Sequence, residues 1–230
     1  APTIFGNSLL LNVTSTGPTY TVTYHNNNAT SGAVPSDQTK NHNVSLNLAT
    51  NSGSLARTGY TFAGWNTQAD GLGTHYTVAG TYTTNASVTL YAKWIMTFDN
   101  WSGGTGFGAD TNGDGTSNGM AWLLGLANKN TNAASRLPVV TPSGGNLQVT
   151  FTCLKVANRG GATLKLQVSD DLGVNDPWTS QEVVVPDSSG TVNGILFTIS
   201  ANADPNLINV QASIPNGTGS KVFARLMGNP

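Results

Sequence analysis

Short stretches in which apolar and polar residues alternate constrain this chain more than any other feature of its sequence. Tyr20-Thr-Val-Thr-Tyr24 and Val44-Ser-Leu-Asn-Leu48 alternate strictly, which places one set of side chains on one face of a β-strand. Residues that favour turns separate such stretches along the chain. The pattern therefore predicts a mainly β protein built from many short strands.

The second half of the chain continues the pattern at spacings typical of a β-sandwich. The expected strands are 147–154, 162–169, 180–185, 191–200, 208–214 and 221–227. Cys153 lies in the alternating run of the first of these strands, so we expect a buried, inward-facing thiol without a catalytic role. It is the single cysteine of the chain, which excludes an intramolecular disulfide.

One stretch of the sequence has a helical pattern. Apolar residues recur at helical spacing from Met120 to Ala127. Ser117 or Thr116 is expected to cap the start of this helix, and Gly125 to end it. We expect this short helix to be the only one in the chain.

The N-terminal residues 3–14 are expected to form a strand, because Leu9, Leu11 and Val13 fall on one face at a period of two. A lone strand is not stable, so it must join a sheet. Two alternatives remain open: pairing within its own subunit, and completion of a neighbouring subunit's sheet by β-augmentation. The residues that would make the second contact are Ile4, Phe5, Leu9, Leu11 and Val13.

The stretch Asp110-Thr-Asn-Gly-Asp-Gly-Thr-Ser-Asn118 fits the first half of an EF-hand calcium loop. Alternate residues offer oxygen atoms there, as a hard cation with six to eight ligands requires. The candidate ligands are Asp110, Asn112, Asp114, Thr116 and Asn118. The twelfth position of such a loop needs a bidentate carboxylate, and this chain has Ala121. We therefore expect weak, structural Ca²⁺ binding, with a dissociation constant of about 0.1–1 mM.

A second interpretation of this loop needs no ion. Asp and Asn side chains accept hydrogen bonds from nearby backbone N–H groups in Asx turns and helix caps. The sequence alone leaves both interpretations open.

The aromatic motifs between residues 20 and 94 resemble a known family. Gly59-Tyr-Thr-Phe-Ala-Gly-Trp65, followed by a glycine turn and by Leu90-Tyr-Ala-Lys-Trp94, is similar to the internalin-type B-repeat, also called the Listeria–Bacteroides repeat. The resemblance implies a small β-grasp-like domain of bacterial surface proteins, used as a spacer or adhesive module and lacking catalytic residues. Trp65 and Trp94 are expected to pack in its core.

The turn doublet in Val168-Ser-Asp-Asp-Leu172, with Trp178 and the closing Val222-Phe-Ala-Arg-Leu226, marks a second resemblance. Over about residues 98–226 the chain resembles a C-terminal module of secreted proteins from Verrucomicrobia and Planctomycetes. In that module a calcium-like loop and a short helix precede a sandwich. The expected fold is thus a β-grasp-like domain and an antiparallel β-sandwich, joined by a calcium-loop-like segment and one short helix. We expect four segments: an N-terminal strand over 1–18, the B-repeat over 19–96, a linker with loop and helix over 97–136, and the sandwich over 137–230.

The sequence offers no catalytic set, so we expect no enzymatic activity. Gly115-Thr-Ser-Asn-Gly119 has the spacing of a hydrolase elbow, but such an elbow needs a later histidine. All three histidines precede it in the chain. Glu182 is the single glutamate, and it lies in an expected strand rather than in a carboxylate pair of the kind that glycoside hydrolysis requires.

The composition of the chain limits the classes of partner that it can be expected to bind. Charged residues make up 9% of the chain and the net charge is -1, so no basic surface is expected for nucleic acid. No apolar run is long enough for a membrane helix. Trp101 lacks a packing role in the sequence pattern and is the candidate for a glycan contact.

These features predict a non-enzymatic extracellular structural protein of a bacterial surface, a subunit of a fibre, layer or adhesive stalk. Its expected partners are other copies of itself or other surface proteins. The alternative is a glycan-binding accessory module of a secreted enzyme. We expect an extracellular or cell-surface location, with the signal peptide already removed before Ala1.

Overall fold

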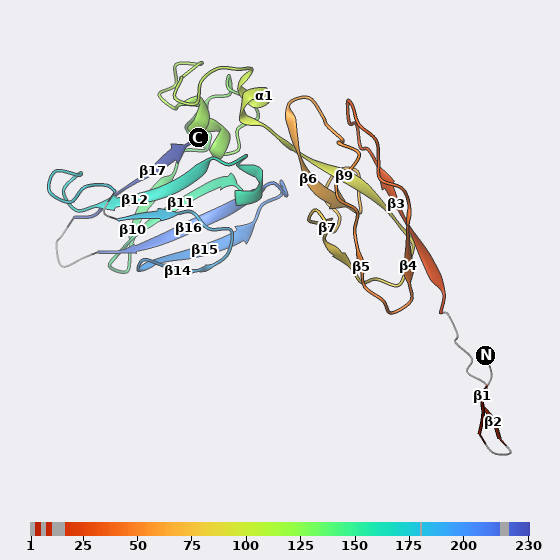
Figure 1. The fold of residues 1–230 in the computed structure, drawn as a ribbon. Coiled ribbons are helices and arrows are strands. Elements are labelled where there is room, and N and C mark those ends of the chain that lie inside the picture. Colours follow the sequence, from red (N-terminus) through yellow and green to blue (C-terminus); the bar gives the residue numbers. More distant parts are fainter. Residues whose placement is uncertain (1–2, 6–7, 11–16, 180, 217–220) are drawn as a thin grey trace. The chain divides into compact units, whose positions relative to one another are not determined.

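The structure is a computed structural model that describes residues 3–5, 8–10, 17–179, 181–216 and 221–230. It is mainly β, as the alternation predicted (Figure 1). The chain divides into two compact units: residues 1–58 with 62–94, and residues 59–61 with 95–230. No helix of the described residues is long and apolar enough to cross a membrane.

The first unit is built on a five-stranded sheet of order β4-β3-β9-β6-β7. Its strands are β3 (Thr19–His25), β4 (Gln38–Asn41), β6 (Tyr60–Asn66), β7 (His75–Tyr76) and β9 (Val88–Met96). The central pair β3 and β9 runs parallel, whereas β3–β4 and β6–β7 run antiparallel. A small second sheet pairs β5 (Leu46–Asn47) with β8 (Thr81–Tyr82). This order, with a parallel central pair, is the β-grasp-like arrangement.

Aromatic side chains fill the core of this unit. Trp65 is fully buried, 4.5 Å from the ring of Tyr24 between centroids, and its Nε1 donates to the carbonyl of Ala49. Phe62 packs edge-on against both Trp65 and Trp94. The predicted packing role of the two tryptophans is confirmed.

A buried lysine fastens the loops at one end of the unit. Lys40 is 1% exposed, and its ammonium donates to the carbonyl of Asn41 (2.7 Å) and to Oδ1 of Asn85 (3.0 Å). Asn85 in turn exchanges two hydrogen bonds with Asn43, through the backbone N–H and the side-chain oxygen of Asn43. No carboxylate of the described residues forms an ion pair with Lys40. The amide of Asn85 is therefore the side-chain group that satisfies this buried cation.

The N-terminal segment differs from the predicted single strand. Its described residues form an antiparallel hairpin of β1 (Thr3–Phe5) and β2 (Ser8–Leu10), so a strand running unbroken over 3–14 is wrong. The sequence between the two strands is Gly6-Asn7, a dipeptide that favours chain reversal. Ile4 and Phe5 fall in β1 and Leu9 in β2, whereas Leu11 and Val13 lie outside the described residues. Among the described strands, the hairpin pairs with no other.

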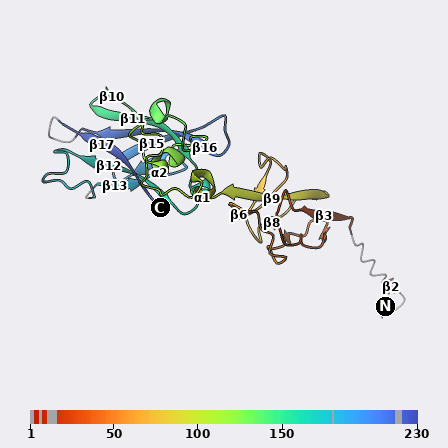
Figure 2. The same ribbon diagram turned by 90° about the horizontal axis from the view of Figure 1, so that it is seen from above.

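The second unit is a β-sandwich, seen from two directions in Figures 1 and 2. Its larger sheet has the order β10-β11-β16-β15-β14 and its smaller sheet the order β13-β12-β17, all antiparallel. The larger sheet contains β10 (Val139–Ser143), β11 (Asn146–Leu154), β14 (Gly190–Val192), β15 (Ile195–Ala201) and β16 (Leu207–Pro215). The smaller sheet contains β12 (Thr163–Ser169), β13 (Glu182–Val184) and β17 (Phe223–Asn229). A short 3₁₀ helix, η2 (Val156–Asn158), follows β11.

The inner faces of the two sheets share one apolar core. Cys153 lies in it fully buried, as predicted, and burial raises the pKa of its thiol to about 11. The buried Arg159 donates to the carbonyls of Leu154 and Val185, near the ends of β11 and β13. The thiol is therefore protonated near neutral pH and shielded from reagents.

Three elements of this unit differ from the sequence prediction. The strand expected over 191–200 is two strands, β14 and β15, which reverse at Asn193 and Gly194 with φ of 49° and 80°. The edge strand β10 and the helix α1 (Phe98–Ser102) were not predicted. Exposed side chains along β10 give it no alternating burial pattern, and α1 is only one turn long.

The Lys40 contact gives a stability prediction. Replacing Asn85 with Ala removes the side-chain acceptor of a buried cation, and we expect the free energy of unfolding to fall by about 1–3 kcal/mol. Urea denaturation measures it. Asn47→Ala is the matched control, because Asn47 is exposed and such a change is worth within about 0.5 kcal/mol.

A second variant separates the cation from the general loss of a side chain. Lys40→Met combined with Asn85→Ala removes the buried cation together with its acceptor and is expected to recover part of the loss, because the two hydrogen bonds between Asn85 and Asn43 stay broken. A double variant no more stable than Asn85→Ala alone would contradict this account.

Candidate functional site: the Asp110–Asn118 loop

The candidate calcium loop is held in a tight curl by its own backbone. The two carboxylate oxygens of Asp110 accept hydrogen bonds from the N–H groups of Gly113 and Gly115, each at 2.9 Å. Both glycines have left-handed backbones, with φ of 69° and 85°, a conformation that glycine adopts without steric cost. The predicted turn chemistry of the loop is therefore present.

Asp114 ties the loop to the segment that follows the helix. Its Oδ1 accepts from the N–H of Thr116 (2.9 Å), and its Oδ2 from the N–H of Ala133 (2.7 Å) at the start of the 3₁₀ helix η1 (Ala133–Ser135). The bond from Ala133 is the largest cause of the lowered pKa of Asp114, and the bond from Thr116 adds to it. Asn112 donates to Asp114 and to the carbonyl of Thr131. Hydrogen bonds thus fix the loop to residues 131–133, on the far side of the short helix that follows it.

Asn118 faces the interior of the loop. It is 1% exposed, and its Nδ2 donates to the hydroxyls of Thr105 and Thr111 at 3.0 and 2.9 Å. Its Oδ1 accepts from the N–H of Thr111, and its backbone N–H donates to the carbonyl of Ala109. The side chain is therefore already engaged in holding the loop closed.

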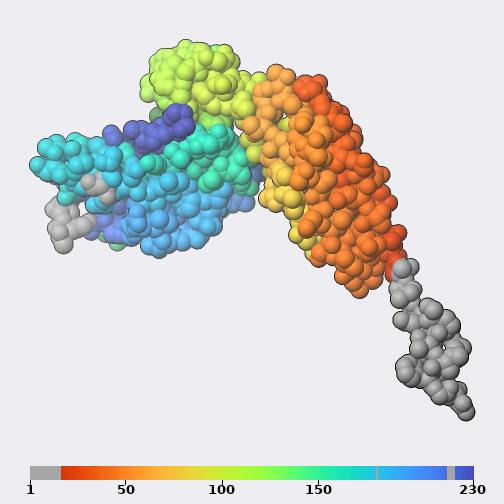
Figure 3. All heavy atoms as spheres, in the orientation of Figure 1, coloured from red at the N-terminus to blue at the C-terminus, as the bar shows by residue number. Residues whose placement is uncertain are grey.

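The helix after the loop is α2 (Asn118–Leu123), close to its predicted position. Ser117 caps it by accepting from the N–H of Met120, and Gly125 follows its end with φ of 75°. A Cβ at Gly125 would lie 2.4 Å from Leu207, so the close approach as well as the backbone requires glycine. Ala121, at the twelfth loop position, is buried in this helix. In Figure 3 the yellow-green atoms of this region form one mass against the sandwich strands.

The loop brings together oxygen atoms suited to a hard cation. Asp110 and Asn112 are exposed and Asp114 is half-buried, and each oxygen that accepts one N–H keeps a second lone pair. Two carboxylates are the whole of its charge, and the described residues contain no group of three His, Cys, Asp or Glu side chains placed for a metal. The donor chemistry of Asp110, Asn112 and Asp114 fits weak binding of Ca²⁺, with two carboxylates where a tight site has more.

The structure corrects the assignment of Trp101 to a glycan contact. Trp101 lies in α1, is 8% exposed, and donates its Nε1 to the carbonyl of Leu126 at 2.8 Å. Its ring stacks on Phe98. The burial of Trp101 leaves no ring face open for a sugar. Trp101 instead anchors α1 to the segment after α2.

Ser117, from the stretch with elbow-like spacing, and the three histidines have structural surroundings. Ser117 is the helix cap described above. Nδ1 of His42 lies 3.0 Å from the hydroxyl of Tyr20, and Nδ1 of His25 accepts from the N–H of Asn27. The pKa of His75 is lowered, chiefly by burial.

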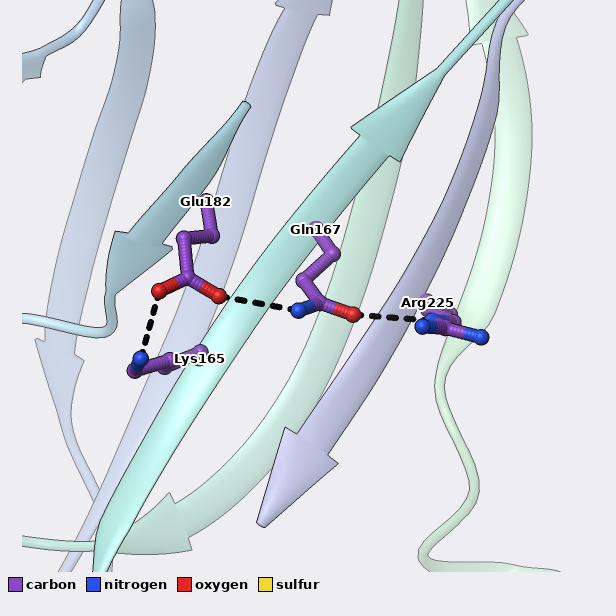
Figure 4. Close-up of polar contacts among 4 residues, drawn as sticks. All are labelled: Lys165, Gln167, Glu182 and Arg225. Atoms are coloured by element: carbon purple, nitrogen blue, oxygen red, sulfur yellow. Dashed lines mark hydrogen bonds and ion pairs between the residues drawn. The ribbon is translucent and has the colours of Figure 1, made fainter. Parts of the chain in front are cut away.

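A polar row crosses the outer face of the smaller sheet and was missed in the sequence (Figure 4). Glu182 forms an ion pair with Lys165 (2.5 Å) and accepts from Gln167 (2.9 Å), and Gln167 accepts from Arg225 (2.8 Å). The hydrogen bond from Lys165 is the largest cause of the lowered pKa of Glu182. The guanidinium of Arg225 also lies 4.4 Å above the ring of Trp178. Only the strand register joins these residues, so no local pattern could have found the row.

A second loop is organised around the carboxylate of Asp171. Desolvation alone would raise the pKa of Asp171, but N–H groups of Asn175, Asp176 and Val174 donate to its carboxylate and hold the pKa at about 2. The ionised form of Asp171 therefore stabilises this loop.

Comparison with known proteins identifies part of the chain. Residues 20–93 match the Listeria–Bacteroides repeat domain, as the aromatic motifs predicted. A predicted Gly-rich membrane protein of Evansella cellulosilytica is 39% identical over 82 residues, which are 34% of this chain and 9% of that protein. A predicted membrane protein of the same organism is 37% identical over 76 residues, 33% of this chain and 11% of that protein.

The matches leave most of each protein uncompared. The chain spans 9% and 11% of the length of these curated relatives. No solved structure matches the chain. The resemblance of residues 98–226 to a C-terminal module of secreted proteins stays a prediction.

Asp171 gives a pH prediction. Its pKa is lower in the folded protein than in the unfolded chain, where it is about 3.9, so its stabilisation is complete above that value. The stabilisation is lost as the pH falls from about 4 toward 2. We expect Asp171→Asn to melt at a lower temperature at pH 6 and to show a smaller drop in melting temperature on acidification.

Asp170→Asn is the matched control. Asp170 is the exposed neighbour of Asp171, and its carboxylate accepts none of these hydrogen bonds. Equal acid sensitivity of the wild-type protein and Asp171→Asn would contradict the assignment.

Proposed function

We propose that this protein is a non-enzymatic structural subunit of a bacterial surface fibre, layer or adhesive stalk. The match of residues 20–93 to a surface-type repeat domain carries the proposal. The relatives named as membrane proteins support a location at the cell surface or outside it. Sparse charge, at 9% of residues, fits a secreted spacer and does not favour nucleic acid.

The roles of the reactive side chains support the absence of enzymatic activity. Cys153 is buried with a raised pKa, Ser117 caps a helix, and Glu182 is paired within a sheet. Each group has a packing or hydrogen-bonding role that accounts for its position. A nucleophile needs a base within hydrogen-bonding reach, and these contacts do not supply one.

Assembly would proceed by β-strand addition through residues 3–14. The hairpin of β1 and β2 forms a two-stranded sheet of its own, and an isolated two-stranded hairpin is marginal in water. Its sequence continues into Leu11 and Val13 and carries no charged residue from position 1 to 16. Such a segment gains stability by joining a larger sheet, and a sheet of another copy provides one.

Deletion of residues 1–15 tests the assembly. We expect the full chain to form ordered particles larger than a monomer, visible by negative-stain electron microscopy, and the deleted protein to remain monomeric. Leu9→Asp with Leu11→Asp should act like the deletion, because each adds a charge to the apolar face. Asn12→Asp is the matched control and should assemble. Monomeric particles of the full chain, unchanged by the deletion, would refute assembly.

We further propose that the Asp110–Asn118 loop binds one Ca²⁺ weakly and that the ion has a structural role. The side chains of Asp110, Asn112 and Asp114, with the carbonyl of Thr116, would hold it. Asn118, named as a ligand in the sequence, would act as the buried anchor that closes the loop. The ion would add rigidity to a loop that hydrogen bonds already shape.

Calcium titration with thermal melting measures this binding. With a dissociation constant of about 1 mM, 10 mM CaCl₂ stabilises by about 1.4 kcal/mol, or roughly 3–6 °C in melting temperature. The shift should be absent in Asp110→Asn and smaller with Mg²⁺, which prefers to keep its waters. An unchanged melting temperature of the wild-type protein in 10 mM CaCl₂ would leave the Asx-turn interpretation.

A glycan-binding module is the weaker candidate. The side chain named for that role, Trp101, is covered by its own packing, and no other observation favours a sugar.

A further inference from the structure

The longest unpaired sheet edge of the sandwich belongs to β17. Its seven residues pair with β12 over their whole length, from Phe223 opposite Ser169 to Asn229 opposite Thr163. On its other side no strand of the described residues is bonded to it, and no backbone hydrogen bond from a turn or loop reaches it. A long, unpaired strand edge is a template for another strand.

The other edges of the sandwich are protected or short. β13 and β14 have three residues each, and β14 begins with Gly190. β10 has five residues, and Pro142 within it has no N–H to donate. β17 is longer than β13 and β14 and contains no proline, so it is the best acceptor of the four, and the side chain of Leu123 in α2 lies beside Gly228 only near its C-terminal end.

The two faces of β17 differ in a way that suits an added strand. Ala224, Leu226 and Gly228 stand opposite the buried residues Val168, Leu166 and Leu164, so they face the core. Arg225 and Met227 face outward, and Arg225 is held by Gln167 and Trp178 (Figure 4). A fourth strand would thus place one set of side chains on the apolar side and the other on the polar row.

The smaller sheet is also too narrow for its partner. Three strands face five, and inward-facing side chains at both margins of the larger sheet are left open. Val140 stands opposite the buried Val149 and so faces the core, yet 49% of it is exposed. Val192 stands opposite the buried Ile195 and is 38% exposed. A wider smaller sheet would cover more of this apolar surface.

We propose that the free edge of β17 accepts the N-terminal segment of a second copy of this chain as a fourth strand. This inference rests on the proposed assembly through residues 3–14 and names its acceptor. Residues 8–14 match the seven residues of β17 in length. Their apolar positions Leu9, Leu11 and Val13 would enter the core beside Ala224 and Leu226.

On assembly, the second strand of the hairpin would change its pairing partner. Residues 8–10 pair with residues 3–5 in the single chain, and on assembly they would pair with β17 of the second copy. The three residue pairs of β1 and β2 would give way to a pairing of up to seven residues. The longer pairing and the added burial favour the exchange.

Cysteine cross-linking in the full chain tests the acceptor. Asn12→Cys is combined in separate variants with Arg225→Cys or Met227→Cys on β17, and with Val184→Cys on β13 or Thr141→Cys on β10 as controls. All four partner positions are exposed. The native Cys153 is buried and protonated near neutral pH, so it does not interfere. Side chains opposite each other on neighbouring strands have Cβ atoms about 4.5–5.5 Å apart.

After mild oxidation of the assembled protein, we expect disulfides between residue 12 of one copy and β17 of another. Their yield should exceed that of the β13 and β10 variants by about tenfold, since a disulfide needs close Cβ atoms. Mixing isotope-labelled and unlabelled protein before assembly, followed by mass spectrometry of the linked peptides, distinguishes links between copies from links within one.

Three outcomes overturn the inference, and they differ in what they say of the proposed function. Links mapped to β10 or β13, from particles that still assemble, reject β17 alone. Links to β17 within a single chain reject the second copy. Monomeric protein with no link in any variant rejects both the acceptor and the proposed assembly.

Discussion

Backbone hydrogen bonding across strands is the constraint on which this structure depends. In the first unit the sheet gains its centre from β3 and β9, which are far apart in the chain and run parallel. In the sandwich every strand of the larger sheet is paired in register with its neighbour. The same rule identifies what is incomplete, namely a seven-residue edge at β17 and a hairpin that no other described strand joins. Strand addition would pair the edge of β17 with residues 8–14 in one contact.

Buried polar side chains also have hydrogen-bond partners. No buried side-chain nitrogen or oxygen of the described residues lacks a hydrogen-bond partner. Lys40 and Arg159 are buried cations that rest on carbonyl and amide oxygens instead of carboxylates. In the Asp110–Asn118 loop, the buried amide of Asn118 donates to the hydroxyls of Thr105 and Thr111. These contacts allow a chain with few charges to bury polar side chains, because a buried polar atom without a partner is costly.

Local patterns in the sequence predicted what is local in the structure. The strands β11, β12 and β16 and the caps of α2 follow directly from alternation, Ser117 and Gly125. The reversal at Asn193-Gly194 was also within reach, since Asn-Gly between apolar runs is a strong hairpin signal. Contacts that depend on tertiary structure could not be predicted from local patterns. The burial of Trp101 depends on Leu126, and the row from Lys165 to Arg225 depends on the register of three strands. In the candidate site, the curl around Asp110 could be predicted, but the inward turn of Asn118 depends on Thr105 and Thr111.

The central claim is that residues 8–14 gain backbone hydrogen bonds from β17 of another copy of the chain. Amide hydrogen–deuterium exchange of wild-type protein, compared between dilute and assembled samples, measures this directly. The account predicts that peptides covering residues 8–14 and 223–229 become protected together on assembly, while peptides of β10 and β13 change little. Rapid exchange of residues 8–14 in assembled protein, or protection that is already complete in a dilute monomer, would contradict it.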